Sequence, residues 1–130
     1  MKFKYKRYGS DTLRPVIPIE VSYNSISIPY EVLIDSGADV CIFDSDISEL
    51  LGIDFIKGVR RELSGVTGMP DYYYLHKLTI IINGIKYKTE VGFMKLRIQA
   101  FGIVGQKGFF DRFIVKFNFK KEDIEVKPTS

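Results

Sequence analysis

The segment Val32-Leu33-Ile34-Asp35-Ser36-Gly37-Ala38-Asp39-Val40 decides how the rest of the chain is interpreted. Its opening apolar run is typical of a buried strand, and a carboxylate interrupts it. An ionised carboxylate is rarely buried without partners, so the Asp35 side chain needs a specific role. Ser36 can donate a hydrogen bond, and Gly37 permits a tight turn with close backbone approach. The segment therefore predicts a carboxylate displayed at the end of a rigid strand, an arrangement that suits catalysis.

An Asx-turn is the plainer interpretation of Asp-Ser-Gly, because a turn aspartate often accepts a hydrogen bond from its own backbone. The flanking sequence favours the catalytic interpretation. A short strand is predicted at 40–43, followed by a helix that Asp44 or Ser45 can cap and that Gly52 can end. Asp44-Ser45-Asp46 is interpreted as this cap, and a metal-binding or phosphatase Asp-x-Asp is the disfavoured alternative.

The remainder of the chain predicts strands, at 16–21, 26–34, 78–82, 85–89, 101–105, 113–119 and 124–126. Asn83-Gly84 favours a tight hairpin, since Asn-Gly suits the positive φ angles of a type I′ turn. Asn24-Ser25 is a second turn signal, and Pro18 indicates an edge or an interruption of its strand. Segment 108–113 is predicted to be a short helix or a turn. We expect one mostly-β domain over residues 1–130, with a core from about 16 to 126 and a polar tail at 127–130.

Composition excludes several classes of protein. The 19 Lys and Arg barely exceed the 16 Asp and Glu, so the net charge of +3 does not indicate nucleic-acid binding. The apolar runs are far shorter than the roughly 18 residues of a membrane-spanning helix, so no membrane partner is expected. The single cysteine, Cys41, cannot form an intrachain disulfide and is compatible with a reducing compartment, which favours the cytoplasm. No His and Cys cluster occurs, so neither a metal nor a cofactor is expected.

The segment from Val32 to Val40 resembles the active-site strand and turn of the retropepsin-like aspartic proteases, whose core motif is Asp-Thr/Ser-Gly-Ala. Ile103-Val104-Gly105 resembles the second motif of that family, two apolar residues and a glycine. Gly65-Val66-Thr67-Gly68 lies where the family carries its flap, a hairpin that closes over the substrate. The resemblance extends from about Val16 to Val126. It implies an acid-protease monomer with a closed or twisted barrel-like sheet and a short helix.

The resemblance also implies an aspartic peptidase whose catalysis needs two carboxyl groups. One acts as general base on a water, and the other, protonated, donates to the scissile carbonyl; in aspartic proteases the pair shares a proton. The chain contains only one Asp-Thr/Ser-Gly, at Asp35-Ser36-Gly37. We therefore expect a homodimer with one Asp35 from each chain at the two-fold axis, acting on a peptide or protein substrate. Ser36, Gly37 and Ala38 would support the turn, with the Ser36 hydroxyls bonding across the dimer.

The sequence departs from the retroviral members after Gly105. Those members typically carry Arg and then Asp or Asn, whereas this chain has Gln106 and Lys107. Gln cannot form the charged fork through which Arg supports the dimer, so the interface is expected to differ in detail. A second function therefore stays open, a dimeric binding or scaffold module of the same fold with little or no peptidase activity. A third is a peptidase domain cut from a larger protein, which the polar segment 121–130 permits.

Several side chains outside the motifs carry their own expectations. Phe117 and Phe119 are interpreted as core residues of a half-buried strand, with a dimer interface as the alternative. Tyr72-Tyr73-Tyr74 either line the substrate cleft or cover the core with the middle ring in water. Cys41 is expected to pack as a small hydrophobe, and His76 to be structural or exposed.

Overall fold

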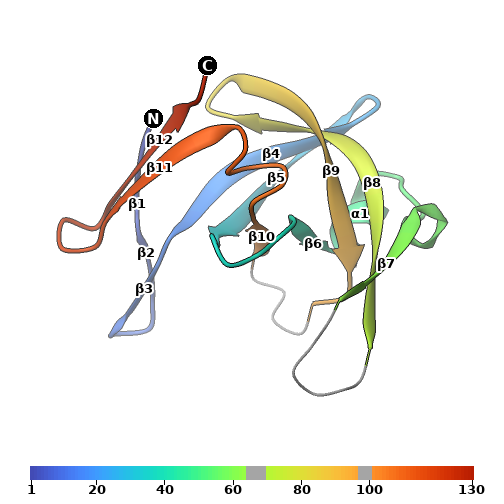
Figure 1. Ribbon diagram of the computed structural model, residues 1–130, viewed down its shortest axis with the longest axis horizontal. Helices are drawn as coiled ribbons and strands as arrows, with labels where there is room; N and C mark the ends of the chain where they lie inside the picture. Colours follow the sequence, from blue (N-terminus) through green and yellow to red (C-terminus); the bar gives the residue numbers. More distant parts are fainter. Residues whose placement is uncertain (64–69, 97–100) are drawn as a thin grey trace.

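The computed structural model describes residues 1–63, 70–96 and 101–130, which are mostly strands (Figure 1). One α-helix, α1 (Ser45–Leu50), and one 3₁₀ turn, η1 (Phe55–Lys57), occur in this described part. The strands are β1 (Lys2–Lys4), β2 (Lys6–Tyr8), β3 (Thr12–Arg14), β4 (Val16–Tyr23), β5 (Ile26–Ile34), β6 (Ile42–Asp44), β7 (Val59–Leu63), β8 (Asp71–Ile82), β9 (Ile85–Met94), β10 (Gly102–Val104), β11 (Phe113–Asn118) and β12 (Asp123–Pro128).

The central sheet closes on itself. Its strand order is β4-β5-β10-β6-β9-β8-β7, and β4 also pairs with β8, so every strand except β7 belongs to a closed barrel. Alternate side chains of β4 point into the barrel, as the sequence pattern requires. Ile17, Ile19 and Val21 are buried, and the residues between them are more exposed. The predicted barrel-like, mostly-β fold is confirmed.

The turn and proline predictions for the barrel are confirmed. Asn83 and Gly84 join β8 to β9 with φ angles of 48° and 87°, and Asn24 joins β4 to β5 with a φ of 54°. These positive angles favour Asn and Gly. Pro18 lies opposite Glu31 of β5, in a part of β4 that β8 does not reach, because β8 pairs with β4 only over Glu20 to Ser22. The missing amide of Pro18 is therefore tolerated.

The helix starts and ends as predicted. Asp44 is the N-cap of α1, and its Oδ2 accepts a hydrogen bond of 3.0 Å from the amide of Asp46. Gly52 follows the helix with a φ of 77°. The second oxygen of Asp44, Oδ1, accepts from the amide of Leu96 at 2.8 Å, which fixes the chain beyond β9 against the helix. Asp44 is thus a structural residue, as its capping interpretation required. No helix in the described residues is long and apolar enough to cross a membrane.

A three-stranded sheet of order β1-β12-β11 joins the two ends of the chain (Figure 1). Phe113, Ile124 and Val126 of this sheet are buried in the same core cluster as the barrel strands. Further along the β11–β12 hairpin, Phe117 and Phe119 are 41% and 64% exposed. Their interpretation as core residues is wrong, because the hairpin extends past the barrel that would have covered them. Residues 108–112 form turns and Phe113 begins β11, so the helical alternative for 108–113 is also wrong.

Candidate active site

The two sequence motifs lie side by side because β10 is inserted between β5 and β6. β10 runs parallel to β5, with Ile103 opposite Leu33 and Val104 opposite Ile34. It also pairs with β6 through Ile103 and Ile42. At the end of β5 the amide of Asp35 donates to the carbonyl of Val104 at 3.0 Å. The aspartate therefore leaves the sheet at a point that β10 fixes.

The turn after Asp35 is tight and hydrogen-bonded. The amide of Ala38 donates to the Asp35 carbonyl at 3.1 Å, and the amide of Gly37 donates to Asp35 Oδ1 at 2.9 Å. The second bond is the one expected of an Asx-turn. It also orients the carboxylate, which is half-buried while Ser36 and Gly37 are exposed. The carboxylate is thus rigidly placed and reachable from outside.

Gly105 allows the second motif to pack directly under this turn. A Cβ atom at Gly105 would lie 2.4 Å from the carbonyl oxygen of Ala38 and 2.7 Å from that of Val40. The next amides bond to the turn: that of Gln106 donates to the Ala38 carbonyl at 2.8 Å and that of Lys107 to the Asp39 carbonyl at 3.0 Å. A glycine is required at this position because the two backbones are in contact.

Cys41 packs beneath the same junction. Its Sγ accepts from the amide of Gly105 at 3.4 Å and donates to the carbonyl of Lys107 at 3.3 Å. The side chain is fully buried, as predicted for a small hydrophobe. Burial raises the pKa of the thiol to about 11. The group is therefore a neutral packing residue under the turn.

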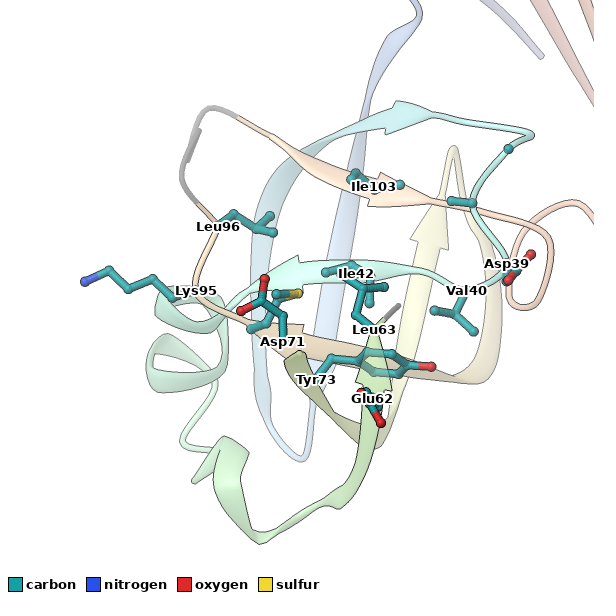
Figure 2. Close-up of a pocket in the computed structure, with 13 residues that line it drawn as sticks. Asp39, Val40, Ile42, Glu62, Leu63, Asp71, Tyr73, Lys95, Leu96 and Ile103 are labelled. Atoms are coloured by element: carbon teal, nitrogen blue, oxygen red, sulfur yellow. The ribbon is translucent and has the colours of Figure 1, made fainter. Parts of the chain in front are cut away.

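A pocket of about 560 Å³ opens beside the turn (Figure 2). Its lining comes from separate chain segments: Gly37, Ala38, Asp39, Val40, Ile42, Glu62, Leu63, Asp71, Tyr73, Met94, Lys95, Leu96 and Ile103. Of the predicted site residues, Gly37, Ala38 and Ile103 line the pocket. Asp35, Ser36, Val104 and Gly105 lie next to lining residues without lining it themselves. The predicted flap residues Gly65, Val66, Thr67 and Gly68 lie outside the described residues.

The tyrosine run divides among three environments. Tyr73 lines the pocket, and its ring lies against Gly92, where an added Cβ would be 2.5 Å from Tyr73 Cδ2. Tyr72 is exposed with the Arg60 guanidinium 4.4 Å from its ring centre, and Tyr74 packs edge-on against Phe55. Tyr73 is the one residue of the run that lines the pocket, whereas the cleft interpretation expected this of all three tyrosines.

His76 has a structural role near the base of the β7–β8 hairpin. Its Nε2 lies 2.7 Å from the carbonyl of Phe55, which as an acceptor requires a proton on that nitrogen. Its ring also packs against Phe93. The prediction of a structural histidine is therefore confirmed.

Sequence reasoning missed the pocket residues on β7, β8 and the end of β9. Glu62, Leu63 and Asp71 come from the first two strands, Met94 is the last residue of β9, and Lys95 and Leu96 follow that strand. Only the register of the sheet brings them to the pocket: Leu63 lies opposite Asp71, and Met94 opposite Asp44. The local sequence carries no signal of that register.

No protein-family model matches the sequence, and no curated protein matches it. Solved structures do match its fold. A retropepsin-like aspartic protease from Rickettsia conorii has a TM-score of 0.69 at 15% identity, over 98% of this chain and 91% of that one. The retroviral protease-like domain of Ddi1 from Leishmania major has a TM-score of 0.58 at 13% identity, over 87% of each chain. EIAV protease, in complex with the inhibitor HBY-793, has a TM-score of 0.50 at 20% identity, over 78% of this chain and 88% of that one. The chain therefore has the fold of the retropepsin-like aspartic proteases, with Asp35 at the end of β5.

Proposed function

We propose that the chain is a homodimeric aspartic endopeptidase. The observation that carries the proposal is the placement of Asp35 on a hydrogen-bonded turn whose next residues, Gly37 to Val40, line a pocket of about 560 Å³. An Asx-turn alone accounts for the bond between Asp35 and Gly37, but it does not account for a pocket beside the turn. Rigid placement next to a pocket is what catalysis requires of a carboxyl group.

The chemistry needs a second carboxyl, which we assign to Asp35 of another copy of the chain. One carboxylate would remove a proton from water, and the protonated partner would donate to the scissile carbonyl oxygen. The exposed Ser36 hydroxyl is free to bond across the two-fold axis. The substrate would be an extended peptide with an apolar side chain next to the cleaved bond, and Gly65 to Gly68 would form the flap over it.

The exposed aromatic residues of the β11–β12 hairpin suit the dimer interface. Phe117 and Phe119 are 41% and 64% exposed, although both are large and apolar. Phe119 packs edge-on against Tyr5, with ring centres 5.5 Å apart. The aromatic surface therefore continues from the hairpin to the segment between β1 and β2. Aromatic residues are enriched in protein interfaces, and a second copy would bury this surface. A reducing compartment, such as the cytoplasm, would suit the single buried Cys41.

The decisive test is Asp35→Asn. The variant should lose peptide cleavage by about a thousandfold or more, because it removes the acid–base group, while its melting temperature and dimer mass stay close to wild type. Cleavage is measured on a diverse peptide library from about pH 3 to about pH 7, where carboxyl pairs titrate. We expect an acidic optimum and inhibition by a statine-type peptide mimic. A variant that cleaved as fast as wild type would refute the proposal.

The second candidate is a dimeric binding module with weak or absent catalysis. Gln106 and Lys107 favour it, because they replace the Arg and acidic or amide residue of the retroviral members. The two functions separate in the same experiment. Tight peptide binding by the wild-type protein without cleavage at any pH would establish the binding module.

A further inference from the structure

The side chain of Gln106 reaches the active-site turn of its own chain. Its Nε2 donates to the carbonyl of Ser36 at 3.1 Å, across a sequence separation of 70 residues. The placement follows from the backbone contact described above. Gly105 lies against the Ala38 carbonyl, and the Gln106 amide donates to that same carbonyl at 2.8 Å, so the Gln106 side chain emerges beside the turn.

Four carbonyls of the turn, those of Asp35, Ser36, Ala38 and Asp39, accept hydrogen bonds. That of Asp35 accepts from Ala38, that of Ala38 from Gln106, and that of Asp39 from Lys107, all through backbone amides. The carbonyl of Ser36 differs from these three, because its donor is a side chain, the Gln106 amide. Removing the Gln106 side-chain amide would therefore leave the peptide unit between Ser36 and Gly37 without this bond at its carbonyl, and the N–H of the same unit is the donor to Asp35 Oδ1.

The chemistry of an amide suits this position. Gln supplies a directed N–H donor with no net charge, whereas Arg would place a fixed positive charge near the catalytic carboxyl. A nearby cation favours the ionised form of a carboxyl group. The proposed carboxyl pair must retain one proton. A neutral donor such as Gln orients the carboxyl group without favouring loss of that proton.

We infer that Gln106 is a positioning residue for Asp35, which orients the carboxylate by holding the Ser36–Gly37 peptide from within the same chain. The inference rests on the proposed function for its catalytic meaning. Gln106 supports the turn of its own chain, so this role does not depend on the partner chain. The turn is accordingly formed before two chains meet.

Gln106→Ala and Gln106→Glu test this role. Gln106→Ala should lower kcat by roughly two- to tenfold, the usual worth of one hydrogen bond, with KM and dimer mass unchanged. Gln106→Glu keeps the shape, but an ionised carboxylate only accepts and cannot bond the Ser36 carbonyl. Below about pH 4 the Glu side chain becomes protonated and donates again. Activity of Gln106→Glu relative to wild type should therefore rise as pH falls through that value, and that of Gln106→Ala should not.

A second measurement does not require cleavage. Amide hydrogen exchange at Gly37 and Ala38 in the substrate-free protein should be faster in Gln106→Ala by roughly two- to tenfold. The control is Lys86→Ala, an exposed side chain on β9 away from the pocket, which should match wild type in every measurement. If the protein proves to have no peptidase activity, the exchange result still decides the positioning role. Unchanged exchange and kcat in Gln106→Ala would overturn the inference, as would dissociation of that variant into monomers.

Discussion

Two walls of the pocket, which Met94, Lys95 and Leu96 also line, are built in different ways. The turn wall consists of Gly37 to Val40 with Ile42 and Ile103, and its backbone is bonded to β10 and to the segment after it. The hairpin wall consists of Glu62, Leu63, Asp71 and Tyr73. It belongs to β7 and the start of β8, and β7 pairs with β8 alone and has every residue exposed.

This difference separates two tasks. The turn wall adjoins Asp35, the group that the proposed chemistry would need held in place, and its supports are backbone contacts that tolerate little change. The hairpin wall is an exposed edge whose side chains a substrate would touch, and regions with few buried contacts open at low cost in free energy. Substitutions in the turn wall should therefore affect kcat and stability, and those in the hairpin wall should affect KM.

The largest effect is expected for Gly105→Ala. The new Cβ would lie 2.4 Å from the Ala38 carbonyl oxygen, so the turn must move away from β10. We expect a loss of about 3 kcal/mol in the free energy of unfolding, measured in urea, and a kcat below a tenth of wild type. Gly84→Ala is the control: its φ of 87° is strained for Ala, but nothing lies within 4 Å of the new Cβ. It should cost only about 1 to 2 kcal/mol and leave cleavage intact. Equal costs for the two variants would contradict the rigid turn wall.

The Cys41 thiol beneath the turn wall gives the next largest effect. Its pKa is raised by burial from 9.0 to about 11, so the folded protein keeps a proton that the unfolded chain loses. This contribution to stability is present below about pH 9 and is lost as the pH rises toward 11, by about 1 to 3 kcal/mol. Urea unfolding of wild type and Cys41→Ala at about pH 8 and about pH 10.5 measures it. Wild type should weaken more than the variant over this range, and parallel losses would contradict the thiol's burial.

The smallest effect is expected for Tyr73→Ala in the hairpin wall. Removing the ring should raise KM about tenfold for substrates with apolar side chains, while kcat changes by less than about twofold. Tyr73→Phe keeps the ring against Gly92 and should resemble wild type. Steady-state kinetics on one peptide substrate separate the two parameters. A fall in kcat with unchanged KM would show that the two walls do not differ in this way.

The sequence predicted those parts of the molecule whose physical cause is local. The apolar run before Asp35, the Asn83-Gly84 turn and the Asp44 cap each carry their own conformational preference, and all appear in the structure. Leu63 and Asp71 meet in the hairpin wall through strand register, which no local preference specifies. The contact between Gln106 and Ser36 likewise depends on two segments far apart in the chain.

Phe117 and Phe119 show a related limit of periodicity. Alternation along 113–119 correctly indicated which residues share a face of the strand. It could not indicate how far the opposite layer extends. Phe113 meets that layer and is buried, whereas Phe117 passes its edge and is exposed. The pattern in one strand specifies which side chains share a face. Whether that face is buried depends on how far the layer packed against it extends.

The insertion of β10 between β5 and β6 has a consequence for the order in which the molecule folds. The Asp35 amide finds its acceptor in Val104, so a long loop must close before the turn is complete. During synthesis Asp35 leaves the ribosome well before Val104 and Gly105 are added to the chain. Until they are added, the turn after Asp35 lacks the backbone contacts that support it. Unfinished or prematurely truncated chains therefore lack an assembled site.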